Sequence, residues 1–529
     1  MPRWFLAAAL VAVGLLAGGC GTGARTSGAG SEKVFRYPLV TSPTTLDPGM
    51  VQDGDTIDLI QQVFEGLVAW GEDNKVHPNL AEKWEVLDGG RTYLFHLKKG
   101  VKFHNGRELT AEDVKFSFER HCDPKFKSPV AQTYLSDIVG VTEKLRGQAS
   151  EVRGVQVVGP YEVKITIDSP KPYFLGKLTY PTAFVVCKEA VQPGQEIRSV
   201  REMVGTGPFR AKEYVPDQLV VLEAFRDYHM GSPKIDRLER PVVKDAQTRL
   251  NMFRSGEIDL LVLERQDVEA VQRDPKLKDQ LRFFDRPGIW YIGMAPKADP
   301  LFANRSFRRA IAMAINRKQI VEQTLRGLCT VAEGIVPPGV LGHRPKAASL
   351  PFDVAAAKRE LAASGVDPSK IRLELTFREQ RPDIKLVAED VAGQLKKNLG
   401  IEVTLRTMEW KAYLEKHQRG EIGFFHMRWM ADYLDPQNFL STMLASYGPE
   451  NTIGYVNPQF DALCRKADVS LNEKERLELY AQAEDIALQD APWVPIYFQR
   501  DPELISPRVK GLRTSLFGHL PHYTVTVDQ

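Results

Sequence analysis

The N-terminal segment sets the strongest limit on what this chain can become. An apolar run from Trp4 to Ala17 follows Arg3, and it is shorter than the roughly 20 residues that a helix needs to cross a bilayer. A basic residue, a short apolar run and then small residues are typical of a secretory signal. No later segment is apolar for long enough to span a membrane, so we expect the rest of the 529 residues to fold as a large body outside the cytoplasm.

The end of this segment predicts a lipid anchor. Gly18 and Gly19 precede Cys20, and small residues followed at once by cysteine resemble a bacterial lipoprotein signal. We predict that residues 1–20 are a lipoprotein signal peptide, that Cys20 carries the lipid, and that residues 21–32 form a flexible tether. Ala17 departs from the pattern, because leucine is commoner three residues before the cysteine. A plain secretory signal followed by a chance cysteine is therefore the alternative.

The balance of charge argues against nucleic acid as a partner. The chain has 70 Lys and Arg residues against 68 Asp and Glu residues, a formal net charge of +2, so it offers no general attraction to phosphate backbones. Its other cysteines lie far apart without a Cys-x-x-Cys pair, which argues against a zinc site: Cys122, Cys187, Cys329 and Cys464. An oxidising compartment allows any of three disulfide pairings among them, and we expect small buried hydrophobic side chains instead.

Signatures of catalysis are missing from the sequence. It contains no His-Glu-x-x-His, no Gly-x-Ser-x-Gly and no Gly-Lys-Ser/Thr loop. Gly205-x-Gly207 is followed directly by Pro208 and lacks the third glycine of a dinucleotide-binding turn. We expect a protein that is not an enzyme, with no catalytic residue, metal or cofactor. A secreted hydrolase is the alternative from another functional class, since a pair of catalytic carboxylates would not stand out among so many acidic residues.

Apolar periodicity predicts an α/β fold. Residues 307–315 and 384–395 place apolar side chains at helical spacing, and Gly400 has the position of a C-cap for the second helix. Ile401, Val403 and Leu405 then alternate as a strand does. Helices alternating with strands indicate α/β packing.

Local signals in the N-terminal half predict further elements. Apolar spacing predicts a helix from Ile57 to Val68, and Asp88-Gly89-Gly90 predicts a hairpin. Thr110 has the position of a helix N-cap, with Asp113 at the third helical position.

The stretch from Met427 to Pro436 (Met-Arg-Trp-Met-Ala-Asp-Tyr-Leu-Asp-Pro) has the most distinctive chemistry. Asp432 lies among Trp429, Met430 and Tyr433, where a carboxylate is costly to desolvate unless a cation or several donors meet it. The α-ammonium of a peptide is one such cation. An Asx-turn or helix cap that satisfies its own backbone is the alternative that these residues leave open.

Segments along nearly the whole mature chain resemble the extracytoplasmic solute-binding proteins of peptide ABC importers, the family of dipeptide-, oligopeptide- and nickel-binding proteins. The segments that carry this resemblance are Phe64–Leu67, Leu80–Trp84, Phe95–Gly106, Leu109–Val114, Val204–Phe209, Phe253–Asp259, Arg308–Ile311 and Pro492–Phe498. Within the family, the chain looks most similar to the oligopeptide binders.

The resemblance implies a periplasmic-binding-protein-like α/β fold in its large three-domain form, with two lobes hinged over a ligand cleft. Domain I would comprise residues 33–64, 188–287 and 500–529, domain II residues 65–187 and domain III residues 288–499. The implied function is to capture peptides, above all oligopeptides, by domain closure and to deliver them to an ABC permease with its ATPase subunits. The implied protein is a monomer outside the cytoplasm that reaches the membrane through its lipid anchor. A chaperone- or sensor-like role would use the same cleft.

The resemblance also implies the ligand site. Asp432 matches the aspartate that takes the peptide ammonium, and Trp429 and Trp410 match aromatic residues of the same cleft, although core packing is the alternative for each tryptophan. For Asp435, a cap of the turn before Pro436 is the favoured role. The remaining residues that we assign to the ligand site are Asn451, Thr452, Tyr433 and Gly54.

Departures from the family pattern bear on the ligand. His417 and His426 stand where the oligopeptide binders place two arginines, and histidine is only partly charged near neutral pH. Val130 replaces the family's tyrosine after Ser128-Pro129, and Tyr134 is the nearest phenol. Arg428, one residue from Trp429, is expected to face the other way. The ligand would then be a longer peptide, a peptide with few fixed contacts at its carboxyl end, or an oligosaccharide, an opine or a metal chelate.

Overall fold

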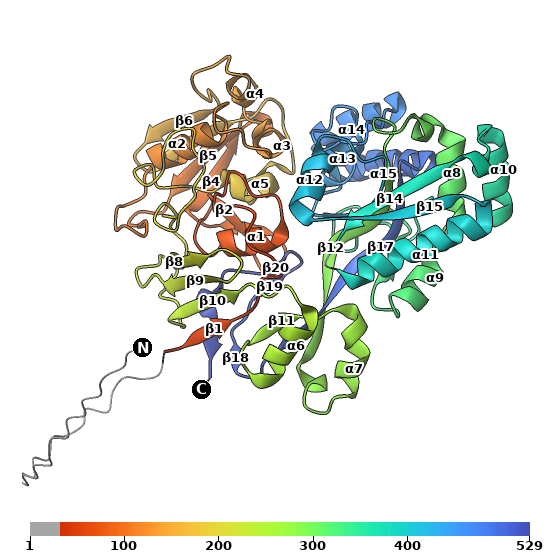
Figure 1. Cartoon of the computed structure of the whole chain (residues 1–529). Helices are drawn as coiled ribbons and strands as arrows, with labels where there is room; N and C mark the ends of the chain where they lie inside the picture. Colours follow the sequence, from red (N-terminus) through yellow and green to blue (C-terminus); the bar gives the residue numbers. More distant parts are fainter. Residues whose placement is uncertain (1–31, 380, 529) are drawn as a thin grey trace, which may run out of the picture. The chain divides into compact units, whose positions relative to one another are not determined.

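Strands of this protein form three main sheets, which Figure 1 shows in the computed structural model. The structure describes residues 32–379 and 381–528. The predicted signal peptide, Cys20 and the predicted tether up to residue 31 lie outside the described residues. Contacts unite Lys33–Gln529 in one compact unit, and all that follows concerns this unit.

Two four-stranded sheets are built from the N-terminal half of the unit. The first runs in the order β1 (Val34–Arg36), β10 (Arg237–Pro241), β9 (Leu219–Ala224) and β8 (Phe209–Val215). The second runs in the order β4 (Ala81–Leu87), β5 (Thr92–Leu97), β7 (Glu162–Thr166) and β6 (Val155–Gly159). The predicted hairpin at residues 88–90 joins β4 to β5 and is confirmed.

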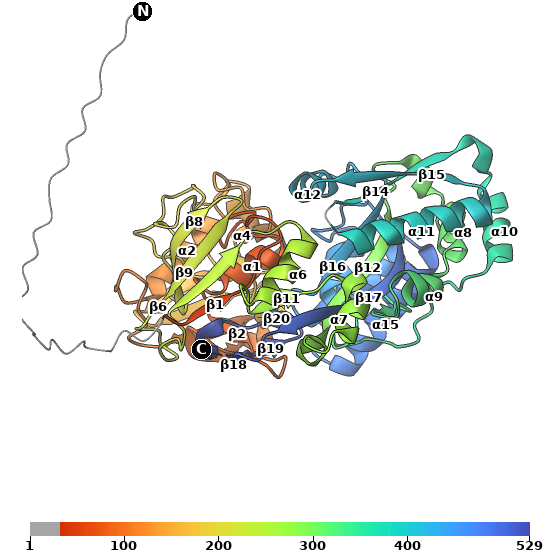
Figure 2. The same ribbon diagram turned by 60° about the horizontal axis from the view of Figure 1, so that its bottom comes forward.

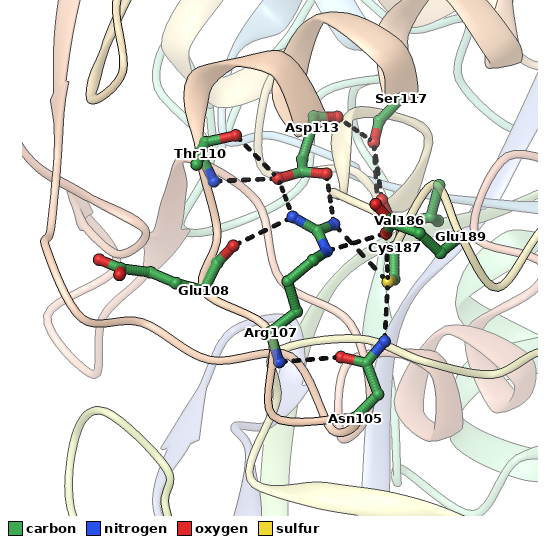
Figure 3. A network of polar contacts seen from close by, with 9 residues as sticks. All are labelled: Asn105, Arg107, Glu108, Thr110, Asp113, Ser117, Val186, Cys187 and Glu189. Carbon is green, nitrogen blue, oxygen red and sulfur yellow. Dashed lines mark hydrogen bonds and ion pairs between the residues drawn. The ribbon is translucent and has the colours of Figure 1, made fainter.

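Helix α2 (Ala111–His121) packs on the second sheet and begins as the sequence predicts. The backbone N–H of Thr110 donates to the Asp113 carboxylate at 2.9 Å, which closes the capping box. Arg107 also binds both oxygens of that carboxylate and bonds Glu189 at 2.8 Å (Figure 3). Because Asp113 is fully buried, the arginine supplies the charge that such a carboxylate needs. Cys187 lies beside this network and accepts a hydrogen bond from Asn105 at 3.3 Å.

The third sheet has seven strands and contains the site described below. Its order is β11 (Leu260–Val262), β17 (Trp493–Ile505), β12 (Leu281–Met294), β16 (Phe424–Met430), β14 (Arg372–Arg378) and β15 (Glu402–Met408), with β13 (Thr330–Val331) paired to β17. Strands β14 and β16 run parallel, whereas β12 is antiparallel to both β16 and β17. The sheet is therefore mixed.

Helices cover both faces of this sheet. One face packs on α8 (Arg305–Ala314), α10 (Val354–Ser364) and α11 (Pro382–Leu399), which lie together in Figure 2. The other packs on α12 (Trp410–Gln418), α13 (Ser441–Leu444), α14 (Pro458–Val469) and α15 (Glu473–Asp490). Strand β12 shows the alternation, since Ile289 and Tyr291 face the second group while Trp290 and Ile292 face the first. Gly400 caps α11 with φ +71°, as predicted.

The remaining elements are short. The short helices are α1 (Gly54–Ile60), α3 (Ala131–Leu135), α4 (Val141–Leu145), α5 (Phe174–Lys177), α6 (Ala246–Ser255), α7 (Val268–Arg273) and α9 (Arg317–Gln319). Two-stranded pairs are β2 (Val68–Trp70) with β3 (Val76–Pro78), β18 (Val509–Lys510) with β21 (Thr526–Val527), and β19 (Thr514–Ser515) with β20 (Gly518–His519).

The predicted helix from Ile57 to Val68 is wrong in its second half. Helix α1 ends at Ile60, and Val68 already belongs to β2. The backbone after the helix bonds a distant segment instead, because Gly207 N–H donates to the carbonyl of Val63 at 2.9 Å. A Cβ on Gly205 would lie 2.0 Å from that carbonyl oxygen, so close backbone packing explains the glycine pair.

All four described cysteines are free and buried, as predicted. Burial raises the pKa of the Cys122 thiol to about 12. Among the described residues, no group of three or more His, Cys, Asp or Glu side chains is arranged to hold a metal ion. No helix within residues 32–379 or 381–528 is both long and apolar enough to cross a membrane.

Candidate functional site

A cavity of about 820 Å³ lies where the N-terminal sheets, β16 and the C-terminal segment meet. Its wall combines residues of α1, β2 and α3 with residues 410–450 and residues 513–523. This volume lies within the range of about 300 to 1,000 Å³ that is usual for small-ligand sites. Segments far apart in sequence therefore line one shared cavity.

Asp432 lies on the wall of this cavity, just after β16 ends. The hydroxyl of Tyr134 donates to its Oδ2 at 2.6 Å, and the side-chain amide of Asn438 approaches the same oxygen at 3.4 Å. Among the described residues, no Lys, Arg or His forms an ion pair with Asp432, and its Oδ1 accepts no hydrogen bond. Burial, which is the largest cause, raises the pKa of Asp432 to about 7. The site thus holds a carboxylate that lacks a positive partner.

Two tryptophans border the same space. Trp429 donates its ring N–H to Asn438 at 3.1 Å, which fixes the indole beside Asp432. Trp410 is the first residue of α12, and the guanidinium of Arg378 lies 4.1 Å from the centre of its ring. Both indoles also pack on the hydrophobic cluster behind β16. The two roles considered for them, cavity wall and core, are therefore compatible.

Glu450 is a second carboxylate on the wall that sequence reasoning missed. The hydroxyl of Thr133 donates to its Oε1 at 2.6 Å, and burial raises its pKa. It lies directly before Asn451, in a loop with no motif of its own. Only the fold brings it to α3, 317 residues away in sequence.

Sequence reasoning also missed a group of arginines at the cavity. Arg381 and Arg428 line the cavity, and Arg378 lies behind them on Trp410. Burial and the neighbouring guanidiniums of Arg381 and Arg428 lower the pKa of Arg378 to about 9. Arg428 and Trp429 point to opposite faces of the sheet, as expected, since Arg428 contacts Trp290 while Trp429 packs on the cluster behind β16, yet both line the cavity. No ion pair to these three arginines is formed by the described residues.

The two predicted histidines carry no charge at neutral pH. Burial lowers the pKa of His417 and that of His426 to about 4. His417 lines the cavity, and its Nε2 has no hydrogen-bond partner among the described residues. His426 instead lies between Trp290 and Tyr497, away from the wall. Neither can replace an arginine as a permanent cation.

The structure does not bring three further predicted residues to the wall. Asn451 uses its amide within its own loop, where Nδ2 donates to the carbonyl of Tyr455 at 2.7 Å. Thr452 donates its backbone N–H to the carbonyl of Glu450. Tyr433 is buried and donates its hydroxyl to Gln437. In this structure the three residues form hydrogen bonds within their own segment and do not line the cavity.

Two other predictions concern turns near the cavity. Gly54 lines the wall at the start of α1. Asp435 caps the turn at Pro436, as predicted, since it accepts from the backbone N–H of Gln437 at 2.9 Å. Asp435 is also paired with Arg476, so its charge is already balanced.

Comparison with known proteins gives the chain its relatives. Residues 75–451 match the family model described as bacterial extracellular solute-binding proteins, family 5 Middle. The probable deoxycholate-binding periplasmic protein YgiS of Escherichia coli (strain K12) is 32% identical over 497 residues, which cover 91% of this chain and 90% of that protein. Heme-binding protein A of Haemophilus influenzae is 31% identical, over 94% and 93% of the two chains.

Solved structures match the whole described unit. The Escherichia coli murein tripeptide binding protein MppA superposes with a TM-score of 0.86 at 26% identity, over 94% of this chain and 99% of that one. Another MppA structure, described as the unliganded open form, gives only 0.69 at the same identity. Residues 33–529 are therefore arranged more like the first structure than like the open form. The superpositions confirm the predicted α/β fold of the periplasmic binding proteins.

Proposed function

Because this chain belongs to the bacterial extracellular solute-binding proteins, family 5, we propose that it captures peptides between two closing lobes and delivers them to an ABC permease. The family consists of solute-binding proteins rather than enzymes. Peptide-binding relatives include the dipeptide-binding protein DppE and the oligopeptide-binding protein OppA of Bacillus subtilis. That this chain also binds peptides is our proposal.

The observation that carries the proposal is the unpaired carboxylate of Asp432 inside the cavity. A peptide ammonium would supply the missing positive charge, and a charge-assisted hydrogen bond in a water-poor cavity is strong. Arg381 and Arg428 would receive the carboxylate of the same peptide. The Trp410 and Trp429 indoles would cover the apolar parts of the cargo.

Closure would bring two parts of the chain together. Thr133 and Tyr134 belong to the proposed domain II (65–187), whereas their partners Glu450 and Asp432 belong to the proposed domain III (288–499). We propose domain I as residues 33–64, 188–287 and 500–529, and separate hydrophobic clusters support this division. A ligand favours the closed arrangement only by binding it better than the open one.

The N-terminal segment completes the proposal. Residues 1–20 would direct export, Cys20 would carry a lipid, and residues 21–32 would tether a monomer to the membrane near its permease. Relatives named as periplasmic proteins support a place outside the cytoplasm.

A second candidate ligand is an apolar organic anion. The arginines beside the Trp410 wall favour it, and the relative named as a deoxycholate-binding protein supports it. An oligosaccharide, an opine or a metal chelate stays an alternative with less support, since none of them explains the unpaired Asp432.

Native mass spectrometry of freshly purified protein tests the proposal, because a closed receptor retains its cargo. We expect bound masses that resolve into peptides after denaturation, and calorimetric binding of tripeptides. A bound steroid-like acid in place of peptides, with no heat from peptide titration, would overturn the peptide assignment. Cleavage products of the peptides in the same samples would support the alternative that the protein is a secreted hydrolase.

A further inference from the structure

Asp432 and Glu450 are held in the same way by neighbouring residues of α3. Tyr134 donates its hydroxyl to one oxygen of Asp432, and Thr133 donates its hydroxyl to one oxygen of Glu450, each at 2.6 Å. The other oxygen of each carboxylate accepts no hydrogen bond from the described residues. Both side chains line the same cavity. Two acceptor oxygens are thus left for groups that enter it.

These two carboxylates lack any compensating cation in the described part of the chain. Burial raises the pKa of both side chains, and Glu450 contributes to the rise at Asp432. Over the whole wall, carboxylates outnumber arginines, and the described wall residues include no lysine. The cavity therefore favours cationic groups at this end.

A third polar group points to a ligand independently of the acids. His417 is only 9% exposed, lines the cavity and leaves Nε2 without a partner among the described residues. Its imidazole is neutral, because burial lowers its pKa to about 4, so one ring nitrogen can accept a hydrogen bond. An ammonium group would satisfy such an acceptor.

Apolar side chains surround these acceptors. The members of the cluster behind β16 that also line the cavity include Tyr291, Trp410, Leu414, Met427, Trp429 and Met443. Long unbranched chains suit such walls, since methionine and indole surfaces adapt to a methylene stem. A lysine-like side chain has both parts, an apolar stem and a cationic end.

We propose that Glu450 is a specificity-determining residue, which with Asp432 makes this end of the cavity a site for two positive charges, so that the preferred cargo is a peptide with a basic first residue. In this site Asp432 binds the α-ammonium and Glu450 binds the side-chain cation, while Nε2 of His417 is a further acceptor elsewhere on the same wall. The inference rests on the proposed function, because it assigns the peptide's amino end to this part of the wall.

The test compares Lys-Ala-Ala with norleucyl-Ala-Ala, which keeps the stem and lacks the side-chain amine. Calorimetry on purified full-length protein, dialysed free of cargo, should give at least about tenfold tighter binding of the lysine peptide. In Glu450→Gln the preference should fall to about twofold or less, because the lysine peptide loses the partner of its side-chain amine and the norleucine peptide has no such amine to lose. The glutamine removes the charge but keeps an oxygen for the Thr133 hydroxyl.

Thr133→Val is the matched control. It removes the hydroxyl that reaches Glu450 and leaves the carboxylate, so it should weaken both peptides equally and preserve their ratio. Loss of the ratio in this variant as well would mean that Glu450 acts only through its contact with α3, which would overturn the inference.

Simple amines separate this inference from the proposed function. If both peptides bind wild-type protein equally, the dication site is refuted while the peptide receptor stands. If neither peptide binds but 1,5-diaminopentane binds at least about tenfold better than pentylamine, the dication site stands and the peptide assignment fails. If neither diamine nor peptide binds, both are overturned.

Discussion

Replacing Asp432 by asparagine should abolish the protein's preference for peptides with a free amino end over peptides with an acetylated one. The Tyr134 hydroxyl still finds an oxygen on the asparagine, so the contact at 2.6 Å is kept and the charge alone is removed. An ammonium loses its carboxylate in this variant, whereas an acetylated end no longer faces an unpaired anion. The two kinds of peptide should therefore respond in opposite directions.

The size of the effect follows from the pKa of Asp432. Burial on the cavity wall raises that pKa from the ordinary 3.8 to about 7, and one pKa unit corresponds to about 1.4 kcal/mol. The ionised side chain therefore costs the closed state about 4 kcal/mol at pH 7.5 and about 2 kcal/mol at pH 5, where part of the cost is removed by protonation. Because the pKa of this acid is raised in the closed form of the protein, the closed form loses stability as pH rises above 3.8. A peptide ammonium can offset this cost, and an acetyl group cannot.

Calorimetry at pH 7.5 with a tripeptide and its N-acetylated form measures the difference. Wild-type protein should favour the free peptide by up to about a thousandfold, and Asp432→Asn should bring the ratio to within about threefold of unity. Small-angle scattering gives an independent reading, because the empty variant should populate the closed form more than empty wild-type protein does. An equal ratio of affinities in the two proteins would refute the reasoning.

Three further predictions concern other parts of the chain. Arg381→Gln should weaken a tripeptide about tenfold or more, yet leave its C-terminally amidated form within about twofold, and calorimetry showing equal losses would contradict the proposed role. His426→Gln should lose less stability on acidification, because a buried histidine whose pKa is about 4 costs folding free energy as pH falls below its ordinary 6.5. Urea unfolding at pH 7 and pH 5 measures the loss of unfolding free energy, which should be about 2 kcal/mol larger for wild type than for the variant. Equal losses in the two proteins would count against the prediction. Asp113→Ala should destabilise the protein by about 2 kcal/mol, because it opens the α2 cap and removes the buried carboxylate that Arg107 binds with two hydrogen bonds; thermal unfolding would show this, and an unchanged midpoint would argue against it.

Local features of the fold could be predicted from the sequence because their causes lie within a few residues. The cap formed by Thr110 and Asp113, the C-cap at Gly400 and the turn cap at Asp435 each depend on groups two to five positions apart. The helix at residues 57–68 failed for the opposite reason. Its apolar spacing reflects burial in two clusters, and the backbone of Val63 is bonded to a segment that no local pattern reveals.

The candidate site was predictable only in part. Asp432 stood out because a carboxylate among aromatic residues needs a partner, and the resemblance supplied its expected role. Glu450 and Arg381 gave no such signal, since Glu450 is held by Thr133, 317 positions away, and Arg381 shares the cavity wall with segments as distant as α1. Asn451 shows the converse, because a matching position in a motif does not reveal that its side-chain amide bonds its own loop.

The four buried thiols have a practical consequence. A protein destined for an oxidising compartment would ordinarily be suspected of needing cross-links, yet none joins Cys122, Cys187, Cys329 or Cys464. Reaching the native state then requires neither an oxidant nor an isomerase, and the chain can be produced in a reducing bacterial cytosol without refolding. Its melting temperature should be indifferent to dithiothreitol, and none of these four thiols should react with a maleimide until the chain unfolds.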